Sequence, residues 1–407
     1  MKRSRTIGWR WTFASLFVSV SVALIGIGII APILPLYADD MSASGVSIGL
    51  VFAAFSLSRA VFAPVVGRLS DRIGRRRLLV LGLSGFAVLS FLYIVANTLW
   101  ILGVLRFLQG AASVMVTPIA QAYVGDITPK GHEGRLMNAF YTAMFVGVGL
   151  GPLLGGWISE VWSYEAAFAA MGVLSVCALG LVTAFVPADH GEAGTSRRMP
   201  KDGMPSLRSL LGNRSVKGIA VYFATRGMWR QGFNAFYPVF ATATAGLSEG
   251  AIGTVLTAYF LAGGILQIPF GFVADRIPRY PQILIGSFGA PILLLFVPCV
   301  RSFAGILLLM LGIGAFSAFS RAAVLAIRTD LGRVHGMGTL AGLQGAAFST
   351  GQMVGPLACG GIADAFGTTA VFPFGSAVGV LGSFLVARWL RPDRASRATE
   401  AHGSSIR

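Results

Sequence analysis

The sequence predicts an all-helical membrane protein with twelve transmembrane helices, built as two parallel repeats of six helices. Three observations lead to this fold class: a composition poor in charge, a series of long apolar runs and an internal repeat. The 407 residues are 55% hydrophobic and 12% charged, with a mean hydropathy of +0.74. A soluble domain carries roughly 25% charged residues. This chain therefore has too little polar surface to cover a globule in water.

The apolar runs are long and continuous, which favours helices over the short alternating segments of a membrane barrel. A helix needs about 20 apolar residues to cross a bilayer. In the first half of the chain we expect spans at 11–36, 47–68, 78–96, 99–124, 135–158 and 165–186. In the second half we expect spans at 216–241, 249–272, 282–300, 302–327, 338–362 and 369–390.

The longest polar break between these runs covers residues 187–215 and is rich in Gly, Pro, Ser, Arg and Lys. Such a composition is typical of a linker. It divides the chain into an expected N-terminal bundle at 1–186 and an expected C-terminal bundle, with its tail, at 216–407. The basic start of the chain is similar to that of a secretion signal. Because the first apolar run is longer than a signal core, we interpret it as a retained helix.

The distribution of Lys and Arg predicts that both termini are cytoplasmic. Most Lys and Arg fall in the tails, the linker and alternate loops, and the expected outer loops hold only Arg301. This asymmetry accounts for the net charge of +16. A basic chain can also bind nucleic acid. Here the charge is spread along one membrane face, so we expect contact with anionic lipid and no nucleic-acid partner.

An internal repeat relates the two halves of the chain by a constant offset of 204 residues. The matching pairs include Gly67 and Gly271, Asp71 and Asp275, Gly151 and Gly355, Pro152 and Pro356, Glu160 and Asp364, and Phe168 and Phe372. One register holds from the second expected span to the last. It predicts parallel six-helix repeats, as in transporters whose two bundles rock about a site near the membrane midplane.

The loop after the second expected span carries the most specific motif, which reads Gly67-Arg68-Leu69-Ser70-Asp71-Arg72-Ile73-Gly74-Arg75-Arg76-Arg77. It resembles the loop motif of the major facilitator superfamily at every defined position. The span count and the repeat extend this resemblance over nearly the whole chain. The resemblance implies a major facilitator fold, with the twelve helices around a central cavity, and transport by alternating access.

A conformational latch is expected at this loop. A carboxylate is favourable at a helix N-terminus, so we expect Asp71 beside a neighbouring helix and Arg75 paired with Asp126. These residues, with Gly67, Arg72 and Gly74, would hold the halves together in the outward-open state. The second copy of the motif is degraded, because Pro278 replaces the glycine. We therefore expect a stronger latch in the first half.

The span at 135–158 combines small residues at helical spacing with a proline: Gly147, Gly151, Pro152, Gly155 and Gly156. Small residues four apart let helices pack closely, and proline permits a bend. The pattern is similar to the antiporter motif of the superfamily, although Asn138 stands where the long form has its first glycine. The span at 338–362 has a looser copy around Gly355 and Pro356. We expect both to act as packing hinges, and ordinary helix packing is the alternative.

Two further segments resemble drug/proton antiporters of the same superfamily. The first span contains Gly28-Ile29-Ile30-Ala31-Pro32-Ile33-Leu34-Pro35-Leu36-Tyr37, and the fourth contains Arg106-Phe107-Leu108-Gln109-Gly110. Together with the loop motif, they favour drug efflux over import of sugars or phosphate.

Five arginines fall within expected spans: Arg59, Arg106, Arg226, Arg230 and Arg321. Each costs roughly 2.5–3.5 kcal/mol if it faces lipid at mid-bilayer. We therefore expect them to face an aqueous cavity, with a snorkelling anchor as the alternative for Arg321. Arg226, Arg230 and Asn234 are four apart and share one helix face. The candidate substrate-binding residues are Tyr37, Arg59, Arg106, Gln109, Tyr141, Tyr222, Arg226, Trp229, Arg230 and Asn234.

None of the 16 acidic residues lies within an expected span. Drug/proton antiporters of the resembled group usually hold an acid in the cavity, and this chain departs from that pattern. A cationic substrate therefore has no counter-ion in the spans, whereas an anion or a zwitterion has several. Proton coupling would have to use groups at the rim, such as Asp39, Asp71 or Asp126.

These observations predict a secondary transporter that exports amphipathic small molecules or drugs, with anionic or zwitterionic substrates favoured. The alternative is an importer or uniporter of a small organic anion. The chain has no metal-ligand spacing, nucleophile motif or phosphate-binding G-x-x-x-x-G-K-[ST] motif. We expect no enzymatic activity, cofactor or metal. The expected partners are a small-molecule substrate, the lipid bilayer and, as a candidate coupling ion, protons. The expected form is a monomer in a bacterial or archaeal plasma membrane.

Overall fold

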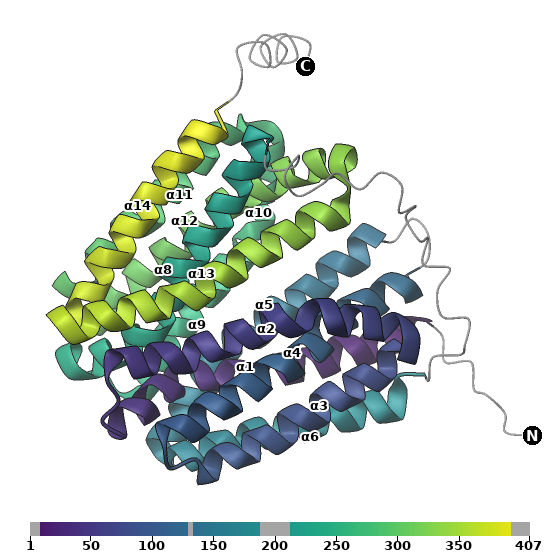
Figure 1. The fold of residues 1–407 in the computed structure, drawn as a ribbon, viewed down its shortest axis with the longest axis horizontal. Coiled ribbons are helices and arrows are strands. Elements are labelled where there is room, and N and C mark those ends of the chain that lie inside the picture. Colours follow the sequence, from purple (N-terminus) through teal and green to yellow (C-terminus); the bar gives the residue numbers. More distant parts are fainter. Residues whose placement is uncertain (1–8, 129–132, 188–211, 392–407) are drawn as a thin grey trace, which may run out of the picture.

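The computed structural model describes residues 9–128, 133–187 and 212–391, and these residues are almost entirely helical (Figure 1). The first half contains α1 (Trp9–Asp40), α2 (Gly45–Ile73), α3 (Arg75–Leu92), α4 (Leu99–Ile127), α5 (Glu133–Val161) and α6 (Tyr164–Phe185). The second half contains α8 (Arg214–Ala245), α9 (Glu249–Ile265), α10 (Gln267–Arg276), α11 (Arg279–Leu295), α12 (Phe303–His335), α13 (Met337–Phe366) and α14 (Val371–Trp389). Three short 3-10 helices complete them: η1 (Tyr93–Val95), η2 (Val297–Cys299) and η3 (Thr368–Ala370). Most of the expected linker lies outside the described residues.

Twelve spanning segments result, because α9 and α10 together form one span that we expected to be continuous. The helix is interrupted at Leu266, three residues before Pro269. Pro269 has no N–H to donate to the carbonyl of Ile265, and Gly263 and Gly264 precede the break. This interruption corrects the expected uninterrupted helix at 249–272.

Ten spans in the described part of the chain are apolar and long enough to cross a membrane. The other two, α8 with 32 residues and α13 with 30, are long enough but more polar. These two helices pack against each other, and each also packs on a helix of the first half. Because these two helices pack on other helices on several sides, fewer of their side chains have to be apolar.

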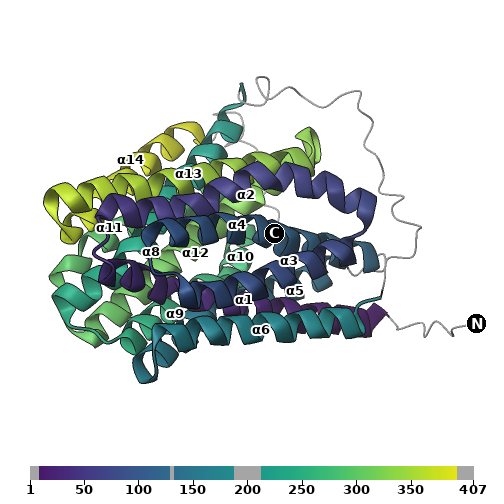
Figure 2. The ribbon, with the colours of Figure 1, turned by 60° about the horizontal axis from the view of Figure 1, so that its bottom comes forward.

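The two halves repeat one packing scheme. In the first half α1 packs on α5 and α6, while α3 packs on α4 and α6. In the second half α8 packs on α13 and α14, while α11 packs on α12 and α14. The halves meet along two helix pairs, α2 with α13 and α5 with α9 (Figures 1 and 2). This is the fold of two six-helix halves that the repeat predicted.

The two ends of the molecule differ in charge, and we name them accordingly. The basic end contains the turn between α2 and α3, with Arg72 and Arg75–Arg77, and the turn between α10 and α11. The acidic end contains the last residues of α1, α5 and α13 and the first residues of α9, with Asp40, Glu160, Asp364 and Glu249.

The halves are in close contact at the acidic end. A Cβ atom on Gly156 of α5 would overlap the carbonyl oxygen of Glu249 on α9, and a Cβ on Gly253 would overlap the carbonyl oxygen of Pro152. In the other pair, a Cβ on Gly49 of α2 would lie 2.5 Å from the carbonyl oxygen of Pro356. Only glycine permits this backbone approach, so these glycines allow the helices of the two halves to pack at this short distance.

Two carboxylates also join the halves at the acidic end. Glu160, near the end of α5, accepts a 2.7 Å hydrogen bond from the backbone N–H of Gly250 at the start of α9. Asp364, near the end of α13, accepts bonds from the backbone N–H groups of Gly45 and Val46 at the start of α2, the latter at 3.0 Å. A helix N-terminus has unpaired N–H groups and a partial positive charge. Each half therefore supplies one carboxylate to a helix start of the other half.

The halves separate toward the basic end. Figure 1 shows α2 and α13 close together at the acidic end and diverging along their length. A Cβ atom would meet no other described atom within 4 Å at Gly67 near the end of α2, or at Gly338, Gly342 and Gly345 at the start of α13. The structure therefore represents a state that is closed at the acidic end and open at the basic end.

Candidate functional site

The turn at the basic end joins α2 to α3 through a single residue. Gly74 has a φ of 94°, a value that L-residues with side chains rarely adopt. Its N–H donates to the carbonyl oxygen of Ser70 at 3.2 Å, so the same glycine ends α2 and precedes α3. Arg72 is exposed. No described atom lies within 4 Å of a Cβ built on Gly67, so this state leaves room for a side chain there. The side chain of Asp71 lies outside the described part of the structure.

Arg75 and Asp126 form an ion pair, with a further hydrogen bond from Arg75 Nη2 to Asp126 Oδ1 at 3.2 Å. The second half contains the same pair 204 residues later, between Arg279 and Asp330, so the degraded copy of the motif retains it. In each half the pair joins adjacent helices of that half. In this state neither pair bridges the two halves, and a latch formed by them stays a prediction.

Arg106 lies in the interior of the first half. It is 4% exposed, and its Nη1 donates a 2.9 Å hydrogen bond to Gln109 Oε1. The hydroxyl of Tyr93 donates to the same oxygen at 3.2 Å. The guanidinium lies over the rings of Phe52 and Phe55, at 5.3 and 4.6 Å from their centroids. These contacts offset part of the cost of its burial, and none comes from the second half. Its Nε is buried without a partner among the described residues.

Three other candidates of the first half lie apart from one another. Arg59 is partly buried and lies 5.7 Å from the centroid of Phe55. Tyr37 donates to the carbonyl oxygen of Ala96 at 2.9 Å and packs its ring against Tyr164 at the acidic end. Tyr141 on α5 is 40% exposed and accepts a 2.6 Å hydrogen bond from Gln121 Nε2 on α4. The structure does not bring these three side chains into one site.

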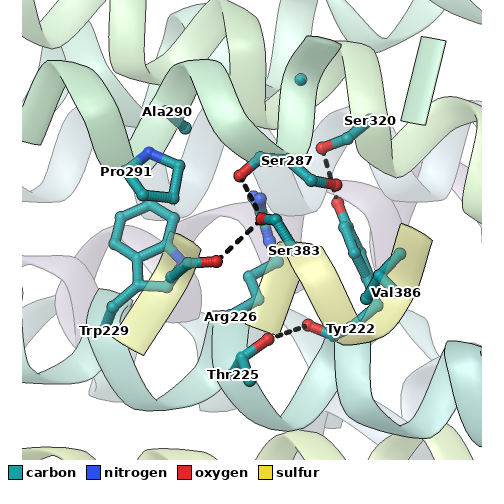
Figure 3. Close-up of a pocket in the computed structure, with 12 residues that line it drawn as sticks. Tyr222, Thr225, Arg226, Trp229, Ser287, Ala290, Pro291, Ser320, Ser383 and Val386 are labelled. Atoms are coloured by element: carbon teal, nitrogen blue, oxygen red, sulfur yellow. Dashed lines mark hydrogen bonds between the residues drawn. The ribbon is translucent and has the colours of Figure 1, made fainter. Parts of the chain in front are cut away.

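The candidates on α8 divide into two groups. Tyr222, Arg226 and Trp229 line a cavity of about 20 Å³ inside the second half, between α8, α11, α12 and α14 (Figure 3). The hydroxyl of Tyr222 bonds to that of Ser320 at 2.8 Å, and Arg226 Nη1 donates to the carbonyl oxygen of Ser317 at 3.3 Å. This cavity belongs to one half and is not the expected central cavity between halves.

Arg230 and Asn234 form the second group. Arg230 lies 5.4 Å from the ring centroid of Phe260 on α9, and its Nε is buried without a hydrogen-bond partner in the described residues. Asn234 Oδ1 is likewise buried and unpartnered there. Unsatisfied buried polar atoms are costly and often mark a functional site.

Arg321, which was not among the candidates, completes this group. Its Nη2 donates to the carbonyl oxygen of Gly263 on α9 at 2.9 Å, and its Nε is buried without a described partner. Its guanidinium lies 5.0 Å from the ring centroid of Phe145 on α5, which belongs to the first half. Arg321 therefore sits where the two halves meet. Its intramembrane charge was the signal in the sequence, although its position nearer the basic end pointed equally to an anchor.

The charged side chains in this region are arginines. Arg230 and Arg321 are close enough to influence each other, and Arg226 is one turn from Arg230 on α8. The ion pairs within the described residues involve Arg75, Arg279 and Arg333. Arg226, Arg230 and Arg321 take part in none of them. The carboxylates described in the structure lie at or near helix ends. Among the described residues, no carboxylate therefore forms an ion pair with these three arginines. The described residues also contain no cluster of His, Cys, Asp or Glu that could hold a metal ion.

The small-residue motif of α5 contacts two helices at once. Cβ atoms on Gly147, Gly151 and Gly155 would collide with α1, whereas a Cβ on Gly156 would collide with α9 of the other half. The looser copy on α13 does the same. Gly355 lies against Met228 of α8, and Pro356 lies against Gly49 of α2. Both expected hinge segments therefore pack within their own half on one side and across the halves on the other.

Comparisons with known proteins agree with this fold. The family model described as "Major Facilitator Superfamily" matches residues 16–242 and 218–406. The chain is 25% identical to multidrug resistance protein 1 of Bacillus subtilis over 401 residues, covering 95% of this chain and 98% of that protein. It is 26% identical to the quinolone resistance protein NorA of Staphylococcus aureus over 365 residues, covering 86% and 89% of the two chains.

Among solved structures, a bacterial homologue of the human lysosomal transporter Spinster, in an inward-facing and occupied conformation, has a TM-score of 0.79. It is 14% identical in sequence, and the match covers 93% of this chain and 97% of that one. The family match, the repeat and the two six-helix halves lead to one conclusion: this chain is an integral multi-pass membrane protein and belongs to the Major Facilitator Superfamily.

Proposed function

We propose that this transporter exports amphipathic small molecules that carry a negative charge, either as anions or as zwitterions. The observation behind the proposal is the pair Arg230 and Arg321. Arg321 lies over the ring of Phe145 where the halves meet, Arg230 lies over the ring of Phe260 on α9, and each has a buried Nε without a described partner. An anionic head group would supply the missing acceptors.

The aromatic side chains support the amphipathic part of the proposal. Phe260 lies beside Arg230, and Phe145 lies beside Arg321. Transporter sites combine apolar walls with a few polar groups that fix orientation. An apolar body would pack on these rings while the head group binds the arginines. A lipophilic cation would meet positive charge without a nearby carboxylate.

Export is the direction that the similar proteins suggest, since two of them are named for resistance to drugs or quinolones. We infer that the basic end faces the cytoplasm, because Lys and Arg concentrate on that side of a membrane protein. In that orientation the structure is open to the cytoplasm and closed to the outside. An exporter binds its substrate in this state, and both termini are then cytoplasmic.

The test is transport in vesicles that contain the purified protein, with matched anionic, zwitterionic and cationic amphiphiles. Arg230→Gln and Arg321→Gln should each weaken transport of the anion by about tenfold or more, the equivalent of one charge-assisted hydrogen bond. Arg301→Gln is the control, because Arg301 is exposed outside the helices. Anion transport unchanged in both variants, or cations carried preferentially, would refute the proposal.

Direction is tested in the same vesicles by sorting them for orientation. An exporter accumulates substrate in inside-out vesicles under an imposed proton gradient. Accumulation only in right-side-out vesicles would identify an importer, and exchange without any gradient dependence would identify a uniporter. Protons remain the candidate coupling ion in this design, and dissipating the pH gradient with an ionophore tests their role.

A further inference from the structure

The cavity inside the second half is lined by a buried arginine and by a buried hydroxyl group that has no partner among the described residues. Arg226 is 7% exposed, and its Nη1 donates a long hydrogen bond, 3.3 Å, to the carbonyl oxygen of Ser317. Ser287 is 8% exposed, and its hydroxyl has no partner among the described residues. Both residues line the cavity. A buried donor without an acceptor is unfavourable, so the hydroxyl of Ser287 can gain from a ligand there, and the long bond of Arg226 leaves its guanidinium able to bind the same ligand.

The remaining hydroxyl groups around the cavity already have acceptors. Tyr222 and Ser320 bond to each other at 2.8 Å, and Thr225 donates to the carbonyl oxygen of Val221 at 2.8 Å. Ser383 donates to the carbonyl oxygen of Ser287 at 2.7 Å. Figure 3 shows Arg226 extending from α8 toward Ser287 and Ser383. Ser287 therefore carries the unpartnered hydroxyl of the lining, and Arg226 extends toward it.

The charge of this cavity is positive and uncompensated. None of its twelve lining residues is acidic, and Arg226 takes part in none of the ion pairs within the described residues. A buried guanidinium requires a counter-charge or a full set of acceptors to offset its lost hydration. An anion satisfies both requirements, whereas a metal cation would be repelled.

The volume limits the size of that anion. The cavity has about 20 Å³, and a single water molecule needs roughly 10–15 Å³ measured in the same way. Space of this size suits one water molecule or one monatomic ion. Pro291, Ala290 and the glycines of the lining supply no further polar groups.

We propose that this cavity is a halide site, occupied by chloride under ordinary ionic conditions, with Arg226 and Ser287 as its donors. The site is separate from the proposed substrate site at Arg230 and Arg321. Because Arg226 lies on α8 and Ser287 on α11, a bound chloride links two helices of the second half. Its binding stabilises the packing of that half and neutralises one of its buried charges.

The experiment is thermal unfolding of the purified full-length protein in detergent, with sodium gluconate exchanged stepwise for sodium chloride or bromide at constant ionic strength. A ligand that binds only the folded state raises the unfolding temperature in a saturable way. The expected result is such a rise with both halides and none with sulfate. Arg226→Gln should abolish the rise, and Ser287→Ala should weaken the apparent halide affinity by about tenfold. Arg301→Gln, which replaces an exposed arginine outside the cavity lining, should respond like the unaltered protein.

Diffraction supplies the second measurement, which needs no variant. Crystals grown in bromide should show an anomalous peak between α8 and α11 beside Arg226. Absence of that peak together with no halide response means that the cavity holds water, and the proposal is then wrong. A halide response that persists in both Arg226→Gln and Ser287→Ala also overturns it. These outcomes are independent of anion transport by Arg230→Gln, so the failure of one proposal is distinguishable from the failure of the other.

Discussion

At the scale of single residues, the arginines within the membrane spans show three solutions to one problem. Burying a guanidinium in a membrane is costly unless it gains partners. Arg106 obtains them from Gln109 and two aromatic rings. Arg226 faces a small polar cavity, Arg230 lies over a ring of α9, and Arg321 lies over a ring of the first half where the halves meet. The same residue type therefore has a structural role in one place and a proposed binding role in another.

A structural role for Arg106 makes a specific prediction. Arg106→Lys keeps the charge but loses the planar group that stacks on Phe52 and Phe55 while bonding to Gln109. We expect a loss of about 1–2 kcal/mol of stability, seen as a lower unfolding temperature in detergent. Arg301→Lys, at an exposed position, should leave the unfolding temperature unchanged. An unaltered unfolding temperature in Arg106→Lys, with loss of substrate binding, would instead place Arg106 in the substrate site.

At the scale of helices, α5 is the element with the tightest requirements. One side of it packs on α1 through Gly147, Gly151 and Gly155, and the other side packs on α9 through Gly156. A small side chain is needed on both sides because backbone atoms of the partner helices approach directly. The helix thus connects the core of the first half to the contact with the second.

Gly156→Ala should therefore destabilise the closed acidic end. The added Cβ would overlap the carbonyl oxygen of Glu249 and force α5 and α9 apart. Overpacking of this kind costs about 1–3 kcal/mol. The distance between spin labels at Trp162→Cys and Ala243→Cys, in a background without the native cysteines, should shift toward longer values. Gly180→Ala on α6 is the control, because no described atom lies within 4 Å of its added Cβ. Unchanged distances in Gly156→Ala would show that the contact can relax without opening.

At the scale of the whole molecule, the two halves close the acidic end by an exchange of carboxylates. Glu160 of the first half binds the start of α9, and Asp364 of the second half binds the start of α2. The two residues are 204 positions apart, as the repeat requires. The closure therefore has the approximate two-fold symmetry of the fold, and each helix start gains a negative partner.

The variant Glu160→Gln/Asp364→Asn should shift the molecule toward the state that is open at the acidic end. Each charge removed from a helix N-terminus weakens closure by about 0.3–1 kcal/mol, and up to about 2 kcal/mol when partly buried. The ratio of closed to open molecules should fall by about tenfold for the pair. Spin labels at Leu50→Cys and Thr369→Cys report the separation of α2 from the second half. The single variants should each give a smaller shift, and a distribution identical to that of the unaltered protein would contradict this account.

At the basic end, the ion pairs Arg75–Asp126 and Arg279–Asp330 show the same symmetry within each half. The halves are apart there, so the action of the first pair as a latch between halves stays a prediction that belongs to the opposite state. The side chain of Asp71 is the member of that latch that the structure does not describe.

The sequence by itself determined the fold class, the twelve spans and the two-half architecture. These depend on hydropathy, charge distribution and a repeat, which are local or periodic properties readable along the chain. It also located the charged residues of the spans. Only the tertiary structure decided which of them share a site. Arg226 and Arg230 lie on one helix and are four residues apart, yet their surroundings come from different helices, α12 and α9. Side-chain environments in a helical bundle are set by contacts distant in sequence, and one helix face does not reveal what packs against it.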